Sequence, residues 1–235
     1  MKKILIFTDG AAKGNPGPGG YGVVILNSGR VYEIGGGKKN TTNNEMELKA
    51  VVEALKSLSE DSIPMEIYSD SKYVVEGATG WIFNWVNNGW KTKAKGDVIN
   101  KELWQQLLPL LKKYEITWNK IPGHVDMNGN DCADRIASGF AEGKNLDLYN
   151  GPQDKYSHDI EDISWDKEKE EERRKARKRQ SAKAYSYVSM VNGDVKTHKT
   201  WTECEARVKG KTGVRFKKAL DEKEEGEVIK QFKGV

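Results

Sequence analysis

Four acidic residues stand where predicted strands and helices end or begin. They are Asp9 and Asp70 at the ends of the first and fourth strands, Glu47 one turn into the first helix, and Asp134 near the start of a later helix. Any one of them alone is compatible with an ordinary solvated carboxylate. The carboxyl ends of neighbouring strands, however, meet at the edge where α/β sheets place their sites. A carboxylate cluster without cysteines or paired histidines favours hard cations such as Mg²⁺ or Mn²⁺.

A glycine-rich stretch surrounds the first of these carboxylates. Residues 7–22 read FTDGAAKGNPGPGGYG and contain no G-x-x-x-x-G-K-[ST] motif. The residues that follow, VVIL, read as a strand and not as a helix whose N-terminus would bind phosphate. We therefore interpret the stretch as the connection between two antiparallel strands.

The periodicity of the first 146 residues predicts the elements that bring the carboxylates together. We expect strands at residues 3–12, 21–27, 30–37, 64–68 and 115–121, and helices at 43–58, 71–76, 100–114 and 131–142. A meander of three strands followed by alternating helices and strands indicates an α/β fold, with a five-stranded mixed sheet flanked by helices.

The chain changes character after this region. Residues 147–183 read as a charged linker, in which acidic residues precede Arg or Lys by three and four positions. This spacing favours a solvated helix, and a plain charged linker is the alternative. Residues 184–235 read as a small ββαβα domain with a hairpin at Asn192-Gly193. Helix caps are predicted at Thr202–Glu205, as a capping box, and at Asp221–Glu224.

Charge is distributed unevenly along the 235 residues. Residues 1–150 hold 18 Lys and Arg against 18 Asp and Glu, whereas residues 184–235 hold 11 against 8. If the partner is a polyanion, we expect the C-terminal domain to hold it.

The composition excludes some classes of protein. No apolar run reaches the roughly 18 residues of a membrane span. The apolar stretch Ile4–Phe7 is too short for a secretory signal, so we expect a cytoplasmic protein. Cys132 and Cys204 are then expected to be reduced, buried thiols.

Four segments, in this order and spacing, closely resemble the motifs of type 1 ribonuclease H. They are TDGAAKGNPGPGGYG, TTNNEMEL, IYSDSKYV and IPGHVDMNGNDCADRIA, and the resemblance covers roughly residues 1–145. It implies a ribonuclease H-like fold in a catalytic domain of residues 1–146. It also implies an endoribonuclease that hydrolyses the RNA strand of RNA–DNA hybrids and leaves 3′-hydroxyl and 5′-phosphate ends.

The resemblance assigns roles to the four carboxylates and to one histidine. Asp9, Glu47, Asp70 and Asp134 would be catalytic and would hold two Mg²⁺ ions, with Mn²⁺ as a substitute. Two cations about 3.5–4 Å apart can activate water and stabilise the leaving oxygen. His124, in a flexible loop, would shuttle protons or aid product release. A loop histidine with an ordinary structural partner is its alternative.

The resemblance also implies contacts to the duplex. Gly10 to Asn15, with Asn43 and Asn44, would follow the minor groove, where the 2′-hydroxyl distinguishes RNA from DNA. A simple helix cap is the alternative for the asparagine pair. Trp81 and Trp85 would stack near deoxyribose, with core packing as their alternative. Thr42 and Asn100 would bind a DNA phosphate.

The sequence departs from its relatives beside these tryptophans. Many bacterial members carry lysines and arginines where this chain has Val86-Asn-Asn-Gly89, and Glu45 stands where a basic residue is common. Lys91, Lys93 and Lys95 compensate in part. We therefore expect the catalytic domain alone to hold polyanions weakly.

The C-terminal segment TWTECEARVKG…VRFKKALDEKE resembles the hybrid-binding domain of eukaryotic-type ribonucleases H. That domain usually precedes the catalytic one, whereas here it follows. The resemblance implies that Trp201, Arg215, Lys217 and Lys218 bind the hybrid, or double-stranded RNA. A generic basic domain with a core tryptophan is the alternative.

Two other functions are compatible with this layout. One is a DNA nuclease of the same broad fold, and the other is a non-catalytic protein that binds hybrid or RNA. The asparagines of TTNNEMEL and the segment GHVDMNGNDCADRIA argue against the first, and the complete carboxylate set argues against the second. We expect a monomer without membrane association.

Overall fold

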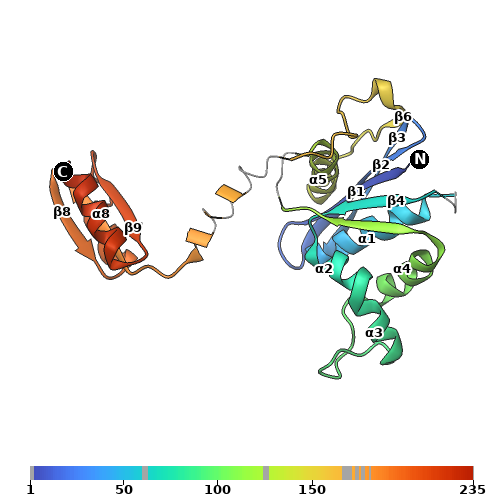
Figure 1. The fold of residues 1–235 in the computed structure, drawn as a ribbon, viewed down its shortest axis with the longest axis horizontal. Helices are drawn as coiled ribbons and strands as arrows, with labels where there is room; N and C mark the ends of the chain where they lie inside the picture. The colour runs from blue at the N-terminus through green and yellow to red at the C-terminus, as the bar shows by residue number, and fades with distance from the viewer. Residues whose placement is uncertain are drawn as a thin grey trace. The chain divides into compact units, whose positions relative to one another are not determined.

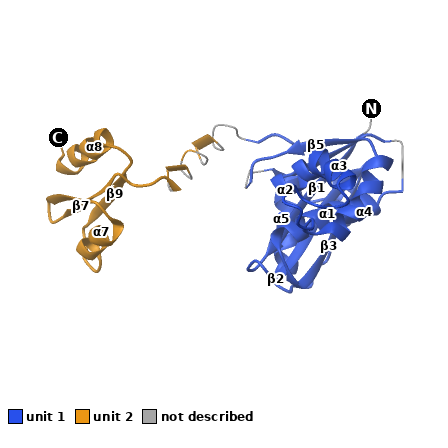
Figure 2. Ribbon diagram, turned by 90° about the horizontal axis from the view of Figure 1, so that it is seen from below, with its two compact units in different colours: residues 1–166 blue, residues 167–235 orange. Residues whose placement is uncertain are grey.

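The computed structural model describes residues 3–59, 63–123, 127–165, 171–172, 175, 178–179 and 181–234. The chain divides into two compact units, residues 1–166 and 167–235, which Figure 2 colours separately. His124 lies outside the described residues, so its expected role stays a prediction.

Among the described residues, the N-terminal unit contains one six-stranded mixed sheet flanked by helices (Figure 1). Its strands are β1 (Ile4–Ala12), β2 (Gly17–Asn27), β3 (Arg30–Thr41), β4 (Met65–Ser69), β5 (Ile116–Lys120) and β6 (Asn150–Pro152). They lie in the order β5-β4-β1-β2-β3-β6, with β1, β4 and β5 parallel. The α/β class and the mixed sheet are confirmed. The sixth strand was not expected, because Asn-Gly-Pro reads as a turn.

The helices of this unit pack on both faces of the sheet. They are α1 (Asn43–Lys56), α2 (Lys72–Glu76), the π-helix η1 (Gly77–Trp81), α3 (Ile82–Asn87), α4 (Lys101–Lys113) and α5 (Asn128–Ala141). α5 begins three residues before the expected position, and its second residue is Gly129. A Cβ at Gly129 would lie 2.5 Å from the ring of Phe7. A glycine there allows α5 to pack closely against β1.

Side chains of alternating residues on β1 enter two different cores. Ile4 and Ile6 are fully buried with α1 and α4, whereas Phe7 is fully buried with α5. This alternation is expected of a strand that is covered on both faces. It leaves Asp9, two residues after Phe7, on the face that α5 covers.

Residues 146–165, which we call the strap, also pack on the N-terminal unit. The strap contains β6, which pairs with β3, and a 3₁₀ turn, η2 (Gln153–Lys155). Its Ile160 is fully buried in the core beneath α5. Residues 147–165 had been expected to form the first part of the linker, but they continue the N-terminal unit.

The C-terminal unit contains, in its described part, a three-stranded antiparallel sheet between two helices (Figure 2). Its elements are β7 (Ser186–Val191), β8 (Asp194–His198), α7 (Trp201–Val208), β9 (Arg215–Ala219) and α8 (Glu222–Lys233). This is the predicted ββαβα order. Asn192 and Gly193 both have positive φ in the β7–β8 turn, as a tight hairpin requires.

Two local predictions for the C-terminal half have different outcomes. Asp221 caps α8 by accepting a hydrogen bond from the backbone N–H of Glu224, as predicted. The capping box of α7, by contrast, is formed by Thr200 and Glu203, so the predicted box at Thr202–Glu205 is wrong.

Of the expected linker helix, the described residues 171, 172, 175, 178, 179 and 181 are helical. Within the described ranges, no helix has the length and apolar character needed to cross a membrane.

Candidate active site

The parallel pairing of β1 with β4 brings the first two carboxylates together. Phe7 is paired with Tyr68, so Asp9 and Asp70 stand two residues further along their chains at the same sheet edge. The backbone N–H of Gly10 donates a hydrogen bond of 2.7 Å to Asp9 Oδ1, which orients that carboxylate. The predicted convergence of strand ends is therefore present.

Glu47 reaches this edge from α1 because the helix lies unusually close to β1. A Cβ at Gly10 would come within 2.2 Å of the backbone nitrogen of Glu47. Only glycine allows this approach, so Gly10 serves the packing of α1. Thr42 caps the helix by accepting from the N–H of Glu45 at 3.2 Å, which starts α1 one turn before Glu47.

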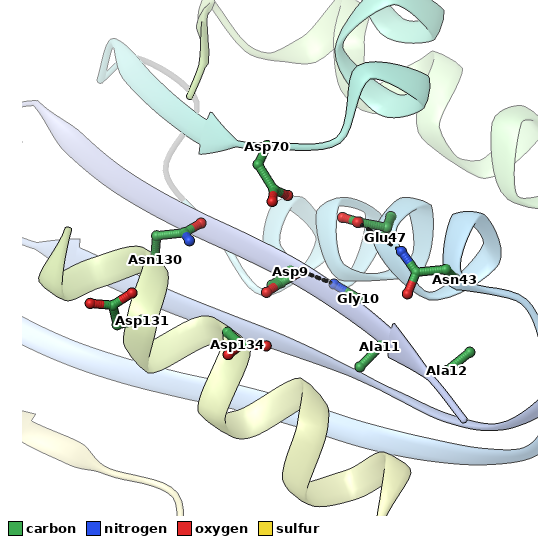
Figure 3. Close-up of a pocket in the computed structure, with 10 residues that line it drawn as sticks. All are labelled: Asp9, Gly10, Ala11, Ala12, Asn43, Glu47, Asp70, Asn130, Asp131 and Asp134. Atoms are coloured by element: carbon green, nitrogen blue, oxygen red, sulfur yellow. Dashed lines mark hydrogen bonds between the residues drawn. The ribbon is translucent and has the colours of Figure 1, made fainter. Parts of the chain in front are cut away.

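The carboxylates converge on one pocket. Asp9, Glu47 and Asp70 each offer an oxygen, and these oxygens all lie within 4.8 Å of one another. Asp134 reaches the same pocket of about 340 Å³ from α5, on the opposite side from Glu47 (Figure 3). The structure thus brings together all four acidic residues predicted from the sequence.

Crowding of negative charge changes the protonation of this cluster. Burial, together with repulsion from Asp70 and Asp134, raises the pKa of Asp9 to about 8. Burial and repulsion from Asp9 and Asp70 also raise the pKa of Glu47. Without a counter-charge the cluster holds protons at neutral pH, so a cation would displace them.

The donor set fits a hard divalent cation. Glu47 is 5% exposed, and its Oε2 has no hydrogen-bond partner among the described residues. Such a buried, unpaired carboxylate oxygen is costly unless something binds it. Oxygen-only ligands suit Mg²⁺, Mn²⁺ or Ca²⁺ better than softer metals. The cluster could therefore bind divalent metal ions.

Two further residues of α5 line the pocket, and sequence reasoning missed both. They are Asn130 and Asp131. Asn130 is 3% exposed and, within the described part of the chain, its Oδ1 has no partner. The signal was its position four residues before Asp134, which places both on one helical face. It was missed because the helix is predicted to begin only at residue 131, which leaves Asn130 outside it.

The residues expected to follow the minor groove lie in part at the same pocket. Gly10 and Asn43 line it, and Asn43 Nδ2 donates to Glu47 Oε1 at 3.1 Å. Asn44 is exposed at the start of α1, and Asn15 is exposed between β1 and β2. Thr42, not an asparagine, caps the helix.

The two tryptophans expected to contact DNA lie in an aromatic cluster beside η1 and α3. Trp81 is 36% exposed and packs on Trp85 at a centroid distance of 5.9 Å. Trp85 in turn packs on the buried Trp104 at 5.3 Å. A second pocket, of about 310 Å³, is lined by Trp81, Asn84, Trp85, Asn88, Lys91 and Lys93. Trp85 thus contributes to core packing and to a surface hollow.

Asn100, the other residue expected at the DNA strand, stands at the start of α4. Its backbone is left-handed, with φ of 57°, and its Nδ2 donates to the hydroxyl of Tyr73 at 3.2 Å. The same hydroxyl accepts from Trp104 Nε1 at 2.9 Å. Asn100 is therefore linked to the aromatic cluster through Tyr73.

The four residues expected to bind nucleic acid in the C-terminal unit do not share one face. Trp201 of α7 is 40% exposed and packs on Phe216 of β9 at 5.3 Å. Lys217 instead approaches α8, where Gln231 accepts from it at 3.4 Å. Alternation along β9 places Arg215 on the α8 side with Lys217.

Lys218 points to the side of Phe216 but makes structural contacts. Its Nζ donates to the backbone oxygens of Arg179, at 3.1 Å, and of Ala182. These carbonyls lie where the helical turns before β7 end.

Both cysteines are buried and free, as predicted.

Comparisons with known proteins agree with this geometry. The family model described as RNase H matches residues 1–142. The ribonuclease H of Erythrobacter litoralis is 46% identical over 142 residues, which span 60% of this chain and 98% of the relative. That of Cupriavidus metallidurans is 47% identical over 138 residues, spanning 59% and 94%.

Solved structures show the same fold. LC9-RNase H1, described as a type 1 RNase H with the type 2 active-site motif, aligns with a TM-score of 0.58 and 26% identity. The alignment covers 68% of this chain and 83% of that one. The PFV RNase H domain aligns with a TM-score of 0.51 and 25% identity, covering 62% and 98%. The chain therefore belongs to the ribonuclease H family, hydrolases that act on the RNA strand of RNA–DNA hybrids and typically use two metal ions.

Proposed function

We propose that this chain cleaves the RNA strand of RNA–DNA hybrids at the pocket between β1, α1 and α5, with Mg²⁺ as the cofactor. The observation that carries the proposal is the convergence of Asp9, Glu47 and Asp70 within 4.8 Å. Asp134 completes the set from α5. The expected products carry 3′-hydroxyl and 5′-phosphate ends.

The residues of the chain prepare this site for catalysis. When bound, two divalent cations supply a water nucleophile and stabilise the leaving oxygen of the ribose. Asp9 is held by the N–H of Gly10 and Glu47 by the side chain of Asn43, so both carboxylates are oriented in advance. Asp134 accepts from Ser138 Oγ at 3.1 Å. His124 is proposed to shuttle protons or to aid product release.

The surroundings of the pocket support a duplex substrate. Gly10 and Asn43 line it, and Asn15, Thr42 and Asn44 lie near by along the chain. We propose that they follow the minor groove of the hybrid. The hollow beside Trp81 and Trp85 offers aromatic faces and is also lined by Lys93 and by Lys91, which pairs with Asp97 at 2.7 Å. These are the groups that hold a sugar–phosphate strand, and we assign the DNA strand to them, together with Asn100.

The C-terminal unit is proposed to raise affinity for the substrate. Its Lys and Arg outnumber its acidic residues, and Trp201 and Phe216 present an exposed aromatic pair. Such groups stack on sugars and contact phosphates without reading sequence. Arg215, Lys217 and Lys218 are proposed to contribute charge. Double-stranded RNA is a second proposed ligand of this unit. We propose a monomer, because the four carboxylates of a single chain already converge on the pocket without a residue from a second copy.

One assay tests the catalytic proposal. Purified protein is incubated with labelled hybrid, double-stranded RNA and double-stranded DNA, each with Mg²⁺, Mn²⁺ or EDTA. Cleavage of the RNA strand of the hybrid alone, stopped by EDTA and absent in Asp70→Asn, is expected. Glu115→Gln, at an exposed carboxylate outside both the pocket and residues 146–165, serves as the control.

The other outcomes distinguish the alternatives. Cleavage of double-stranded DNA would indicate a DNA nuclease of the same fold. Binding of hybrid without cleavage under any metal would indicate a non-catalytic binding protein. A gel-shift series with the three duplexes then shows which of them the C-terminal unit prefers.

A further inference from the structure

We propose that the strap, residues 146–165, is a positioning element of the active site that fixes α5 and thereby Asp134. The inference rests on the proposed function, because it concerns the same pocket. The RNase H family match ends at residue 142, before the strap begins. The strap nevertheless completes the sheet through β6 and the core through Ile160.

The first attachment is a buried carboxylate on β3. The side chain of Glu33 is 2% exposed. Its Oε1 accepts from Arg135 Nη2 of α5 at 2.6 Å and from the hydroxyl of Tyr156 at 2.7 Å. Its Oε2 accepts from the backbone N–H of Tyr149 at 3.0 Å. Glu33 therefore joins α5 to two residues of the strap, and Arg135 is the neighbour of Asp134.

The second attachment lies at the start of α5. Asn128, the first residue of the helix, donates from Nδ2 to the backbone oxygen of Asp159 at 2.9 Å. The next strap residue, Ile160, is fully buried in the cluster that contains Met127 and Cys132. The strap thus holds the helix at its first turn through both a hydrogen bond and apolar contact.

These two attachments flank the residues of α5 that line the pocket. Asn130, Asp131 and Asp134 all lie between Asn128 and Arg135. A hydrogen-bonded helix moves as a unit, so holding it at both points sets the position of these three side chains. Catalytic groups tolerate displacements of only about 0.5 Å. The strap is therefore placed to control where Asp134 meets the other carboxylates.

Three single substitutions in the full chain separate positioning from simple stabilisation. Tyr156→Phe removes the hydroxyl that donates to Glu33 and keeps the ring. Asn128→Ala removes the exposed contact with Asp159, a change too small to prevent folding. Tyr149→Phe is the matched control: its hydroxyl donates at 2.7 Å to Pro152 within the strap, and its backbone contact with Glu33 is kept.

The readouts are Mg²⁺ affinity by calorimetry without substrate, kcat and KM for hybrid across a Mg²⁺ titration, and the unfolding temperature. Loss of a group that supports a metal ligand typically costs about 10–100-fold in metal affinity or activity. We expect Tyr156→Phe to weaken Mg²⁺ binding and lower kcat by roughly tenfold, with KM for hybrid unchanged. Asn128→Ala should act in the same direction by a smaller factor, and Tyr149→Phe should match the wild type.

The proposal would be overturned by a variant whose unfolding temperature falls while its Mg²⁺ affinity and kcat, measured well below that temperature, stay unchanged. The strap would then be only a stabilising element. An equal effect of Tyr149→Phe would also overturn the proposal. If Tyr156→Phe does not fold, Asn128→Ala decides between these outcomes. Failure of the proposed function is recognised separately, because the wild type would then bind Mg²⁺ and cleave no hybrid.

Discussion

The two units of this chain are both built from strands and helices, but they place their functional side chains differently. In the N-terminal unit, side chains from β1, α1, α5 and Asp70, just after β4, converge on one pocket, and Glu47 is almost completely buried there. In the C-terminal unit, Trp201 and Lys217 lie on opposite sides of a small sheet and stay exposed. Chemistry on a phosphodiester needs charged groups that converge on the reacting atoms in a fixed geometry. Holding a polyanion needs only exposed charge and aromatic surface.

The largest expected effect comes from a single carboxylate of the N-terminal unit. Asp70→Asn should abolish hydrolysis, because the remaining acidic groups no longer form a complete ligand set. The loss should exceed the 10–100-fold that removal of an outer-sphere partner typically costs. Binding of hybrid, measured by fluorescence anisotropy in Ca²⁺, should change little. Near wild-type cleavage by this variant in Mg²⁺ would contradict the assignment of the site.

Removal of the C-terminal unit should have the next largest effect, and on a different constant. Protein truncated after residue 165 keeps the strap and should keep kcat, whereas KM for hybrid should rise by about tenfold or more through loss of the tethered contact. The rise should grow with salt, because phosphate contacts release counterions. The same KM for both proteins across a salt titration would show that the C-terminal unit does not hold the substrate.

Truncation after residue 150 tests whether the strap belongs to the N-terminal unit. This cut lies close to the boundary predicted at residue 146, but it removes Tyr156 and Ile160 from the N-terminal unit. We therefore expect this protein to lose kcat as well as affinity. Equal kcat for the proteins ending at 150 and 165 would indicate that the boundary lies at the earlier position.

The sequence predicts the site well where strands dictate geometry. Asp9 and Asp70 follow apolar runs that pair in parallel, so their convergence follows from strand direction alone. The sequence predicts the structure poorly where tertiary packing decides which residues form a strand or enter the core. Asn150-Gly-Pro has the composition of a turn, and only its pairing with β3 makes it a strand. Ile160 stands in a mostly polar stretch that forms neither a helix nor a strand, so no regular secondary structure marks it as core.

The capping box of α7 shows the same limit on a small scale. Thr200–Glu203 and Thr202–Glu205 both match the S/T-x-x-E pattern, so the local sequence does not choose between them. A helix that starts at Trp201 puts Trp201, Cys204 and Val208 on one face towards the sheet. The tertiary contact therefore selects the earlier register.

Stability without metal offers a pH test of the crowded carboxylates. The pKa of Asp9 is raised to about 8 in the folded state, above its value in the unfolded chain. A raised pKa stabilises the fold at acid pH, and this contribution is lost as pH rises towards 8. Asp9→Asn has no carboxylate to ionise, so it does not lose this contribution. In EDTA at pH 8 it should therefore unfold at a higher temperature than the wild type. At pH 5 the difference between the two unfolding temperatures should be smaller. Each kcal/mol corresponds to about 2–4 °C for a protein of this size.

Saturating Mg²⁺ should reverse the order of the two proteins in the same measurement. The wild type gains stability from a cation that binds only the folded state, whereas Asp9→Asn lacks a ligand and gains less. An unfolding temperature of the wild type that does not respond to pH or to Mg²⁺ would contradict the crowding described for the pocket.

The smallest expected effect separates two neighbouring lysines of β9. Lys217 makes one long contact with Gln231, so Lys217→Gln should leave the unfolding temperature unchanged. If Lys217 contacts a phosphate of the hybrid, Lys217→Gln should lower the slope of log binding constant against log salt concentration by about one. Lys218 donates to the carbonyls of Arg179 and Ala182, so Lys218→Gln should lower the stability of the C-terminal unit. Hydrogen bonds from a charged group are typically worth about 1.5–3 kcal/mol, a shift that calorimetry detects. A salt slope that falls for Lys218→Gln and not for Lys217→Gln would instead place the duplex on the α7 face, beside Trp201 and Phe216.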